Sequence, residues 1–180
     1  MRYLDVILKR LLFRMPCACK VSVPYYPDNA EWGPLFWTIL HGLAEKAGRA
    51  VIQADEAREW KKFIKETGDV LPCDDCRQHF QKFLEINPIT QLHTIPYNTI
   101  KDFLKNWFFT LHNDVNARKG YPIFIYADLE VKYSSIDFRD TLWRLEPVMK
   151  KVIQLSGVSL MKWKNWIHSL KMLKATLSIP

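Results

Sequence analysis

The sequence predicts an all-α protein built on an antiparallel bundle of four helices, with a helical extension at the C-terminal end. Apolar residues recur at the three- and four-residue spacing of amphipathic helices, and almost no segment alternates as a β-strand does. The four bundle helices are short and closely connected, which favours antiparallel neighbours. The 180 residues are 48% hydrophobic and 25% charged, so collagen-like, low-complexity and wholly disordered chains are excluded.

The first two predicted helices are amphipathic, and each ends at a glycine. Residues 34–48 and 55–67 place apolar side chains at helical intervals. Gly48 and Gly68 stand where the two patterns stop, and glycine commonly ends a helix. The apolar stripes consist of Phe36, Trp37, Leu40, Leu43, Ala44 and Ala47 in the first helix, and of Trp60, Phe63 and Ile64 in the second.

The third and fourth helices carry a cysteine pair and the longest apolar stripe. Residues 73–86 place Cys73 and Cys76 at a helix start, with the second sulfur turned toward the core. The fourth helix ends before the stop signals Gly120 and Pro122. Its stripe consists of Ile100, Phe103, Leu104, Trp107, Phe108, Leu111 and Val115.

Two further helices are predicted after Tyr133, over residues 138–155 and 158–174, with Gly157 between them. We interpret them as an added helical lobe or as a surface for a partner. The chain is therefore divided into an N-terminal segment, a central domain and a basic extension, at residues 1–29, 30–135 and 136–180.

The net charge of +7 is concentrated at the two ends of the chain. Residues 1–20 carry five basic and one acidic residue, and residues 136–180 carry eight and three, whereas residues 21–135 are slightly acidic. A nucleic-acid-binding domain concentrates basic residues on its structured core. We therefore expect solvated helix faces or contacts with an acidic partner, and no specific nucleic-acid binding.

The N-terminal residues do not have the pattern of a secretory signal. Lys9, Arg10 and Arg14 interrupt the apolar residues there, which favours a basic amphipathic helix that ends at Pro16. No apolar run approaches the ~18 to 20 residues that span a bilayer. The sequence therefore predicts no transmembrane segment.

The four cysteines form two close pairs, Cys17 with Cys19 and Cys73 with Cys76. Structural disulfides usually join distant parts of a chain, so tight pairs indicate redox or metal sites. All four thiolates could bind one zinc ion, Cys76 and His79 could belong to a mixed zinc site, or the thiols could be inert. The spacing alone leaves redox chemistry and zinc binding equally open.

Three motifs stand in order over about residues 30 to 135. They are Trp37-Thr-Ile-Leu-His41, Leu71-Pro-Cys-Asp-Asp-Cys76 and His112-Asn-Asp-Val-Asn116, the last followed by Gly120, Pro122 and Phe124. Together they resemble the Erv/ALR family of FAD-linked sulfhydryl oxidases. The resemblance implies a bundle that holds FAD beside a disulfide. It also implies electron transfer from thiol-containing protein substrates to FAD and then to molecular oxygen, giving hydrogen peroxide, usually in a homodimer.

The resemblance implies different roles for the two cysteines of the central pair. Cys73 is expected to face the substrate, and Cys76 is expected to react with the flavin. A helix N-terminus favours a thiolate, which speeds exchange near neutral pH. Asp74 and Asp75 carry negative charge within the motif and are expected to moderate that effect.

The cofactor residues implied by the resemblance come from several predicted helices. Aromatic and imidazole rings can stack on a flat ligand, although His41 and His112 could equally be satisfied core residues. Asn113 and Asn116 are poor residues for a helix interior unless their amides have a task. The cofactor-binding set is Gly33, Trp37, His41, His112, Asn113, Val115, Asn116, Arg118, Lys119, Lys132 and Tyr133, in which Arg118, Lys119 or Lys132 would neutralise phosphate and Tyr133 would replace a tryptophan of the family.

The cysteine content resembles that of viral members of the family. Glu85 and Phe109 stand where cellular relatives carry an additional disulfide, so packing must hold this bundle together. The family also implies a mobile shuttle dithiol, for which Cys17 and Cys19 are the candidates. We expect a location in a virion or the host cytoplasm, with the mitochondrial intermembrane space as the alternative. The competing hypothesis is a noncatalytic, zinc-stabilised interaction module.

Overall fold

The computed structural model describes residues 25–180, and within that range it is all helical, as predicted. Cys17, Cys19 and the predicted N-terminal helix lie outside the described residues. The helices are α2 (Asn29–Glu45), α3 (Gln53–Val70), α4 (Asp74–Ile86), α5 (Ile100–Lys119), α6 (Asp128–Tyr133), α7 (Phe138–Gln154) and α8 (Leu160–Thr176), with short 3-10 helices η1 (Ile89–His93) and η2 (Tyr97–Thr99) between α4 and α5.

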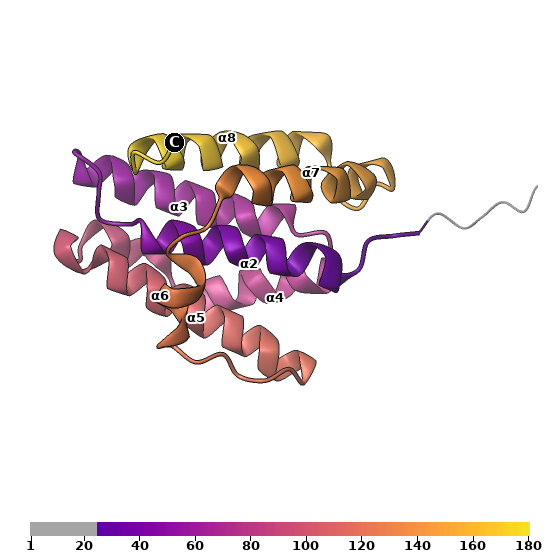
Figure 1. Ribbon diagram of the computed structural model, residues 1–180, viewed down its shortest axis with the longest axis horizontal. Coiled ribbons are helices and arrows are strands. Elements are labelled where there is room, and N and C mark those ends of the chain that lie inside the picture. The colour runs from indigo at the N-terminus through magenta and orange to yellow at the C-terminus, as the bar shows by residue number, and fades with distance from the viewer. Residues whose placement is uncertain (1–24) are drawn as a thin grey trace, which may run out of the picture.

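The helices are arranged in layers around α2 and α3 (Figure 1). Helices α4 and α5 lie on one side of this pair, and α7 and α8 lie on the other. Helix α3 packs along α8 and also contacts α4, while α2 contacts α5, α6 and α7. Helices α2 to α5 therefore form the predicted bundle, and the C-terminal helices add a further layer to it.

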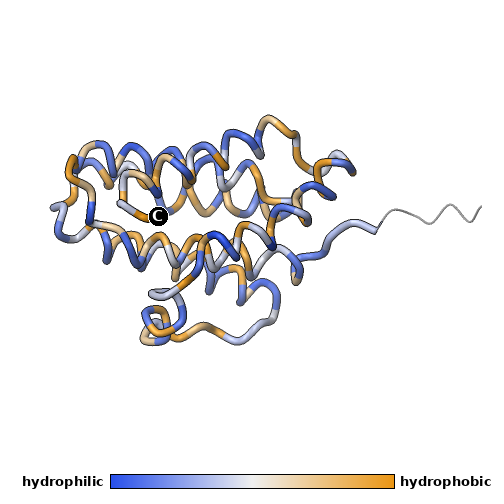
Figure 2. Tube along the Cα trace, turned by 45° about the horizontal axis from the view of Figure 1, so that its top comes forward, coloured by the Kyte–Doolittle hydropathy of each residue, from blue (hydrophilic) through white to orange (hydrophobic). Residues whose placement is uncertain are grey.

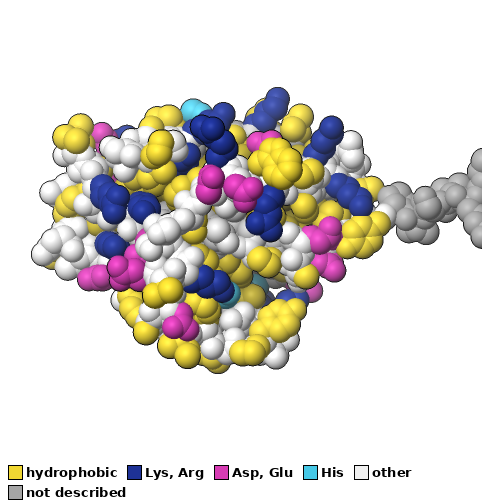
Figure 3. All heavy atoms as spheres, viewed as in Figure 1, with side chains coloured by type: hydrophobic (Ala, Val, Ile, Leu, Met, Phe, Trp, Pro, Cys, Tyr) yellow, Lys and Arg dark blue, Asp and Glu magenta, His cyan; other side chains and the backbone are white. Residues whose placement is uncertain are grey.

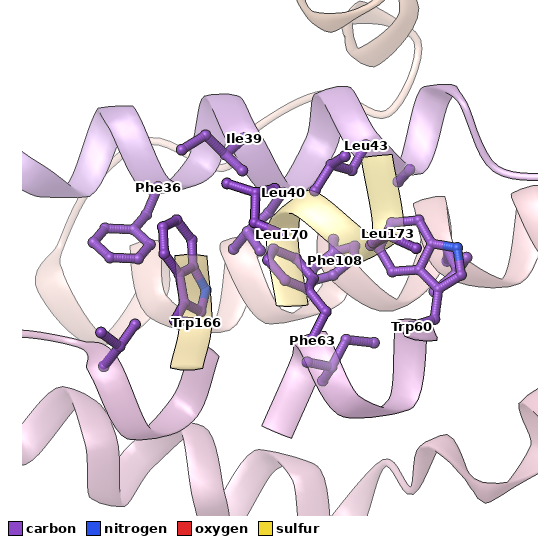
Figure 4. Packing of buried hydrophobic residues seen from close by; sticks show 14 of the residues in the cluster. Phe36, Ile39, Leu40, Leu43, Trp60, Phe63, Phe108, Trp166, Leu170 and Leu173 are labelled. Atoms are coloured by element: carbon purple, nitrogen blue, oxygen red, sulfur yellow. The ribbon is translucent and has the colours of Figure 1, made fainter. Parts of the chain in front are cut away.

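The C-terminal helices share one hydrophobic core with the bundle. Trp166, Leu170 and Leu173 of α8 are at most 1% exposed and belong to the same buried cluster as the apolar faces of α2 and α3 (Figure 4). The Trp166 indole also donates a hydrogen bond of 2.9 Å to the Thr67 hydroxyl. Along both layers the hydrophobic residues face inward and the hydrophilic ones outward (Figure 2). Burial of these apolar faces stabilises the bundle without a disulfide among the described residues.

The start of α2 and the end of α3 differ from the predicted boundaries, each for a physical reason. Helix α2 begins five residues before residue 34, because Asp28 caps its first turn and Glu31 completes a capping box. Helix α3 continues through Gly68 to Val70. A Cβ atom at residue 68 would lie 2.7 Å from Cδ1 of Phe80, so this glycine allows α4 to approach α3 closely.

Helix α2 also ends at Glu45, three residues before the predicted end at residue 48, and the remaining predicted boundaries agree with the structure to within two residues. Gly120 ends α5 with a positive φ of 69°, a conformation that glycine adopts without strain. Helix α6 was not predicted, because six residues are too few to show a helical period. Among residues 25–180, no helix has the length and hydropathy needed to cross a membrane.

Candidate cofactor and dithiol site

A cavity of about 430 Å³ opens between α2, α4 and α5. It lies on the face shown in Figure 3, where the surface is hollowed between α2 and α5 and a histidine is visible. Its volume is within the usual range for a small-molecule site. The predicted site residues on its wall are Gly33, Trp37, Cys76, His112, Val115, Asn116, Arg118 and Lys119.

Stacked rings form one wall of the cavity. The Trp37 and His112 rings are nearly parallel, with centroids 4.0 Å apart. His41 lies behind them, where its Nε2 atom shares a hydrogen bond of 2.9 Å with Nδ1 of His112. Tyr133 stacks on the far side of His41 at 4.6 Å. His41 and Tyr133 therefore support the wall from outside the cavity lining.

Both histidines of this wall are neutral at physiological pH. Burial, the neighbouring His112 and the charge of Lys132 lower the pKa of His41 to about 3. Burial and Lys132 lower the pKa of His112 to about 4. Neutral imidazoles can stack and share a hydrogen bond without the cost of a buried charge.

The two asparagines of the third motif hold the chain that follows α5. Asn113 makes two hydrogen bonds with Phe124, because its amide nitrogen donates to the Phe124 carbonyl at 3.0 Å and its carbonyl oxygen accepts from the Phe124 N–H at 2.8 Å. Asn116 donates to the Pro122 carbonyl at 3.0 Å. These contacts bring the Phe124 ring onto His112, with centroids 5.6 Å apart.

The predicted basic residues are not all at the cavity. Arg118 and Lys119 are exposed residues of its lining, at the C-terminal end of α5. Lys132 lies outside the lining, and its ammonium group is 4.8 Å from the centroid of the Phe124 ring. The structure therefore brings two of the three candidate phosphate-neutralising residues to the cavity.

The dithiol lies at the start of α4, as predicted. Cys73 is the N-cap residue, and its sulfur accepts a hydrogen bond of 3.3 Å from the Cys76 N–H. Burial, followed by the hydrogen bond and charge of Cys73, raises the pKa of Cys76 to about 12, while Lys119 opposes this shift. In the dithiol state the proton is therefore held more tightly on Cys76 than on an ordinary cysteine.

The two sulfur-bearing residues open onto different spaces. Cys76 lines the aromatic cavity, whereas Cys73 lines a second hollow of about 530 Å³. The pair is therefore accessible from the aromatic cavity at Cys76 and from the second hollow at Cys73. A dithiol placed in this way can exchange with a thiol on one side and react with a bound group on the other.

The structure adds residues that the sequence analysis had not assigned to the cofactor. His79 lies on the cavity wall three residues after Cys76, and its Nε2 atom contacts a carboxylate oxygen of Asp114 on α5. Thr67 of α3 also lines the cavity. The helical spacing of His79 from Cys76 could have indicated that His79 lines the same cavity. Nothing in the sequence indicates that Thr67 does so.

Gly33 provides a test of whether the cavity fits a bound cofactor. It lies on the cavity wall in the second turn of α2, yet a Cβ atom built there would meet no protein atom within 4 Å. Packing within the protein therefore does not require a glycine at this position. Open space beside a flat ring wall fits a planar group such as the flavin of FAD.

The fold, the dithiol and the ring-walled cavity together define a helical redox protein of the dithiol–flavin class. The Erv1/Alr family model matches residues 34–134, which is more than half of the chain, and the chain belongs to this family. No solved structure shows significant similarity to the chain.

Relatives from a virus, a fungus and a plant share this region. The chain is 32% identical over 109 residues to the FAD-linked sulfhydryl oxidase of African swine fever virus, which covers 57% of this chain and 80% of the relative. It is 28% identical over 104 residues to the mitochondrial FAD-linked sulfhydryl oxidase erv1 of Schizosaccharomyces pombe, covering 58% and 54%. It is 28% identical over 130 residues to FAD-linked sulfhydryl oxidase ERV1 of Arabidopsis thaliana, covering 70% and 61%.

The comparisons give no support to the hypothesis of a zinc-stabilised module. Within residues 25–180, no three histidine, cysteine or acidic side chains are grouped so that they could hold a metal ion. Cysteine spacing alone had left redox chemistry and zinc binding equally open, and family membership favours redox chemistry.

Proposed function

We propose that this protein is an FAD-dependent thiol oxidase that forms disulfide bonds in protein substrates and reduces molecular oxygen to hydrogen peroxide. The observation that carries the proposal is the position of the Cys73–Cys76 pair between two spaces. Cys76 lines a cavity walled by stacked rings, and Cys73 lines a separate hollow. The names of the relatives support the same chemistry.

Thiol–disulfide exchange begins at Cys73 when the pair is oxidised. A substrate thiolate attacks the Cys73 sulfur, the bond between Cys73 and Cys76 breaks, and Cys76 leaves as a thiolate. The second substrate thiolate then attacks the mixed disulfide, which releases Cys73 and completes the substrate disulfide. Two electrons thus reside on the Cys73–Cys76 dithiol.

Bound FAD supplies the acceptor that takes these two electrons and passes them to oxygen. The charge of Lys119 favours the Cys76 thiolate that this step requires. Trp37 and His112 provide a flat wall for a ring system, and the open space at Gly33 leaves room for it. His41, Asn113 and Tyr133 position this wall from behind.

The remaining predicted cofactor residues occupy three kinds of position. Val115 and Asn116 lie on the cavity wall, one helical turn from His112. Arg118 and Lys119 are placed to neutralise phosphate at the end of α5. Lys132 lies against the Phe124 ring. Burial is the main cause that lowers the pKa values of His41 and His112, and the charge of Lys132 lowers them further.

The shuttle role of Cys17 and Cys19, the homodimer and the cellular location remain proposals. Helices α7 and α8 lie against α2 and α3, so a homodimer must pair through surfaces other than the covered face. We place the protein in a virion or the host cytoplasm, because relatives include viral enzymes, with mitochondria as the alternative because other relatives are mitochondrial.

The visible absorption spectrum of the purified protein tests the proposed function directly. A flavin band should bleach when dithiothreitol is added without air and should return when air is admitted. Cys76→Ala should retain the band but lose bleaching, whereas Cys73→Ala should retain the band and bleach slowly. A colourless protein that contains stoichiometric zinc would refute the oxidase.

A further inference from the structure

The chain between α5 and α6 runs alongside α5 in an extended course (Figure 1). Contacts with α5 recur at every second residue of this segment. They join Pro122 to Asn116, Phe124 to Asn113, and Tyr126 to Phe109. Two residues of extended chain advance about 6.6 Å, and three to four residues of a helix advance about 4.5 to 6 Å. The segment therefore runs antiparallel to α5, and its alternate residues face away from that helix.

The residues that face away from α5 are large and apolar. Tyr121, Ile123 and Ile125 are 60%, 59% and 63% exposed, and together they form what we call the apolar strip. Alternate residues that face water in an extended chain are normally polar. Closely spaced apolar side chains on a surface are typical of an interaction site. Tyr121 also lines the aromatic cavity, so the strip begins at the rim of that cavity.

Two asparagines occupy the edge of the segment that faces α5. The Asn113 amide pairs with both backbone groups of Phe124, and the Asn116 amide donates to the Pro122 carbonyl. In an extended chain the backbone groups of successive residues point to opposite edges. The N–H and the carbonyl of Ile123 therefore point to the outer edge, away from the asparagines.

The outer edge carries backbone groups that no described residue uses. The Tyr121 N–H donates to the Asn116 carbonyl, and the Ile125 carbonyl accepts from the Asp128 N–H. Within residues 25–180, no partner is found for the Tyr121 carbonyl, for either backbone group of Ile123, or for the Ile125 N–H. A strand edge with unpaired groups can pair with a strand from another chain.

The unpaired groups on this edge are complementary to those of a second copy. In an antiparallel pair with a two-fold axis at Ile123, the two Ile123 residues exchange both of their hydrogen bonds. Each Tyr121 carbonyl then accepts from the Ile125 N–H of the other copy. The Tyr121 N–H and the Ile125 carbonyl also lie opposite each other, and both are already paired within their own chains. Every group on the edge is therefore satisfied in this register.

The charges that flank the apolar strip match the same arrangement. Exposed Arg118 and Lys119 precede the strip, and exposed Asp128 and Glu130 follow it. An antiparallel second copy brings the basic end of one chain opposite the acidic end of the other. A parallel copy would bring like charges together. A surface that is complementary to itself in this way is typical of a two-fold homodimer.

We propose that the apolar strip is the dimer interface of this protein, in which two copies pair antiparallel through residues 121–125. The inference rests on the homodimer proposed above and not on the redox chemistry. The interface lies on the α5 side of the bundle, away from the face that α7 and α8 cover. It also covers Tyr121, so the second copy lies at the rim of the aromatic cavity.

Sedimentation equilibrium of the purified full chain measures the dissociation constant of the dimer. Ile123→Lys should raise this constant at least tenfold, because burial of an isoleucine is lost and two ammonium groups meet at the axis. Val51→Lys changes an exposed apolar residue between α2 and α3 and is the matched control, which should leave the constant unchanged. An unaltered protein that is monomeric at every concentration, or equal effects of the two substitutions, would overturn the proposal.

Cross-linking tests the register of the pair. Opposite residues of a hydrogen-bonded antiparallel pair have Cα atoms about 5.5 Å apart, within the range of a disulfide. Ile123→Cys is made in a full chain whose four native cysteines are replaced by serine. Diamide, which accepts the two electrons and two protons released, should join the introduced thiols into a covalent dimer. Val51→Cys in the same background should stay monomeric, and equal yields or no linkage at Ile123→Cys would overturn the register.

A charge exchange tests the antiparallel direction. At saturating FAD, Arg118→Asp should weaken dimerisation by placing like charges together, and Arg118→Asp/Asp128→Arg should restore it. A double variant that is no stronger than the single variant would overturn the antiparallel arrangement. Oxygen uptake with dithiothreitol is measured in parallel on the unaltered protein. Its absence would refute the oxidase without affecting the interface.

Discussion

The buried histidine pair predicts a stability that depends strongly on pH. His41 and His112 have pKa values of about 3 and about 4 in the folded protein, against about 6.5 in an unfolded chain. As the pH falls below about 6.5, the unfolded state therefore binds protons at these histidines that the folded state does not bind. Stability should be present in full near pH 7.5 and should decline from about pH 6.5 toward pH 4.

The magnitude follows from the size of the two shifts. At pH 5 each histidine costs the folded state about 2 kcal/mol relative to pH 7.5, so the pair costs about 4 kcal/mol. For a protein of this length that corresponds to a drop of roughly 8 to 16 °C in melting temperature. The burial of both rings, at 2% and 8% exposure, is the structural cause.

The assay is urea unfolding of the FAD-loaded protein at a series of pH values, followed by tryptophan fluorescence. His41→Gln/His112→Asn should be less stable at pH 7.5, yet its unfolding free energy should fall by about 4 kcal/mol less between pH 7.5 and pH 5. Substitution of the exposed His168 on α8 by Gln is the matched control. Equal losses in the double variant and the unaltered protein would refute the assignment of neutral, buried histidines.

Three further substitutions separate chemistry from packing around the cavity. Lys119→Gln should raise the pKa of Cys76 further, so flavin reduction by dithiothreitol at saturating FAD should need higher pH, whereas Lys119→Arg should restore the profile. Gly68→Ala should lower the unfolding free energy by about 1 kcal/mol, because the clash with Phe80 outweighs the gain in helix propensity; an unchanged urea midpoint would contradict this. Gly33→Ala should leave the FAD-free protein at least as stable but weaken FAD binding in a flavin titration, and unchanged affinity would mean that the cofactor does not approach this residue.

Helical periodicity predicted most of the fold because the buried faces are long and regular. The stripe of α5 contains seven apolar residues, and its end at Gly120 follows from the left-handed conformation that glycine adopts there. The same reasoning wrongly placed the end of α3 before Gly68. This glycine has a helical backbone and does not end the helix, and its missing side chain allows Phe80 to pack closely against α3. A glycine in a periodic sequence does not reveal which of these two tasks it performs.

The candidate site was predictable in its residue types and less so in its arrangement. The resemblance to the family implied Trp37 and His112, but only the tertiary structure shows that their rings stack at 4.0 Å. Asn113 was predicted to have a task for its amide, and in the structure that amide holds the backbone of Phe124. The hollow at Cys73 could not be predicted, because one of its walls is a turn near Gly157 that pairs with Arg77 across 80 positions of sequence.

Trp166 belongs to the C-terminal extension but completes the hydrophobic core of the segment that precedes it. The match to the family model ends at residue 134, yet this indole from α8 lies fully buried against Phe36 and Phe63 of the matched region. Removal of the last helix would uncover both phenylalanines and leave the Thr67 hydroxyl, on the cavity wall, without its donor. The segment matched by the family model therefore contains the Cys73–Cys76 pair, while part of its hydrophobic core is supplied by a helix that follows it in the sequence.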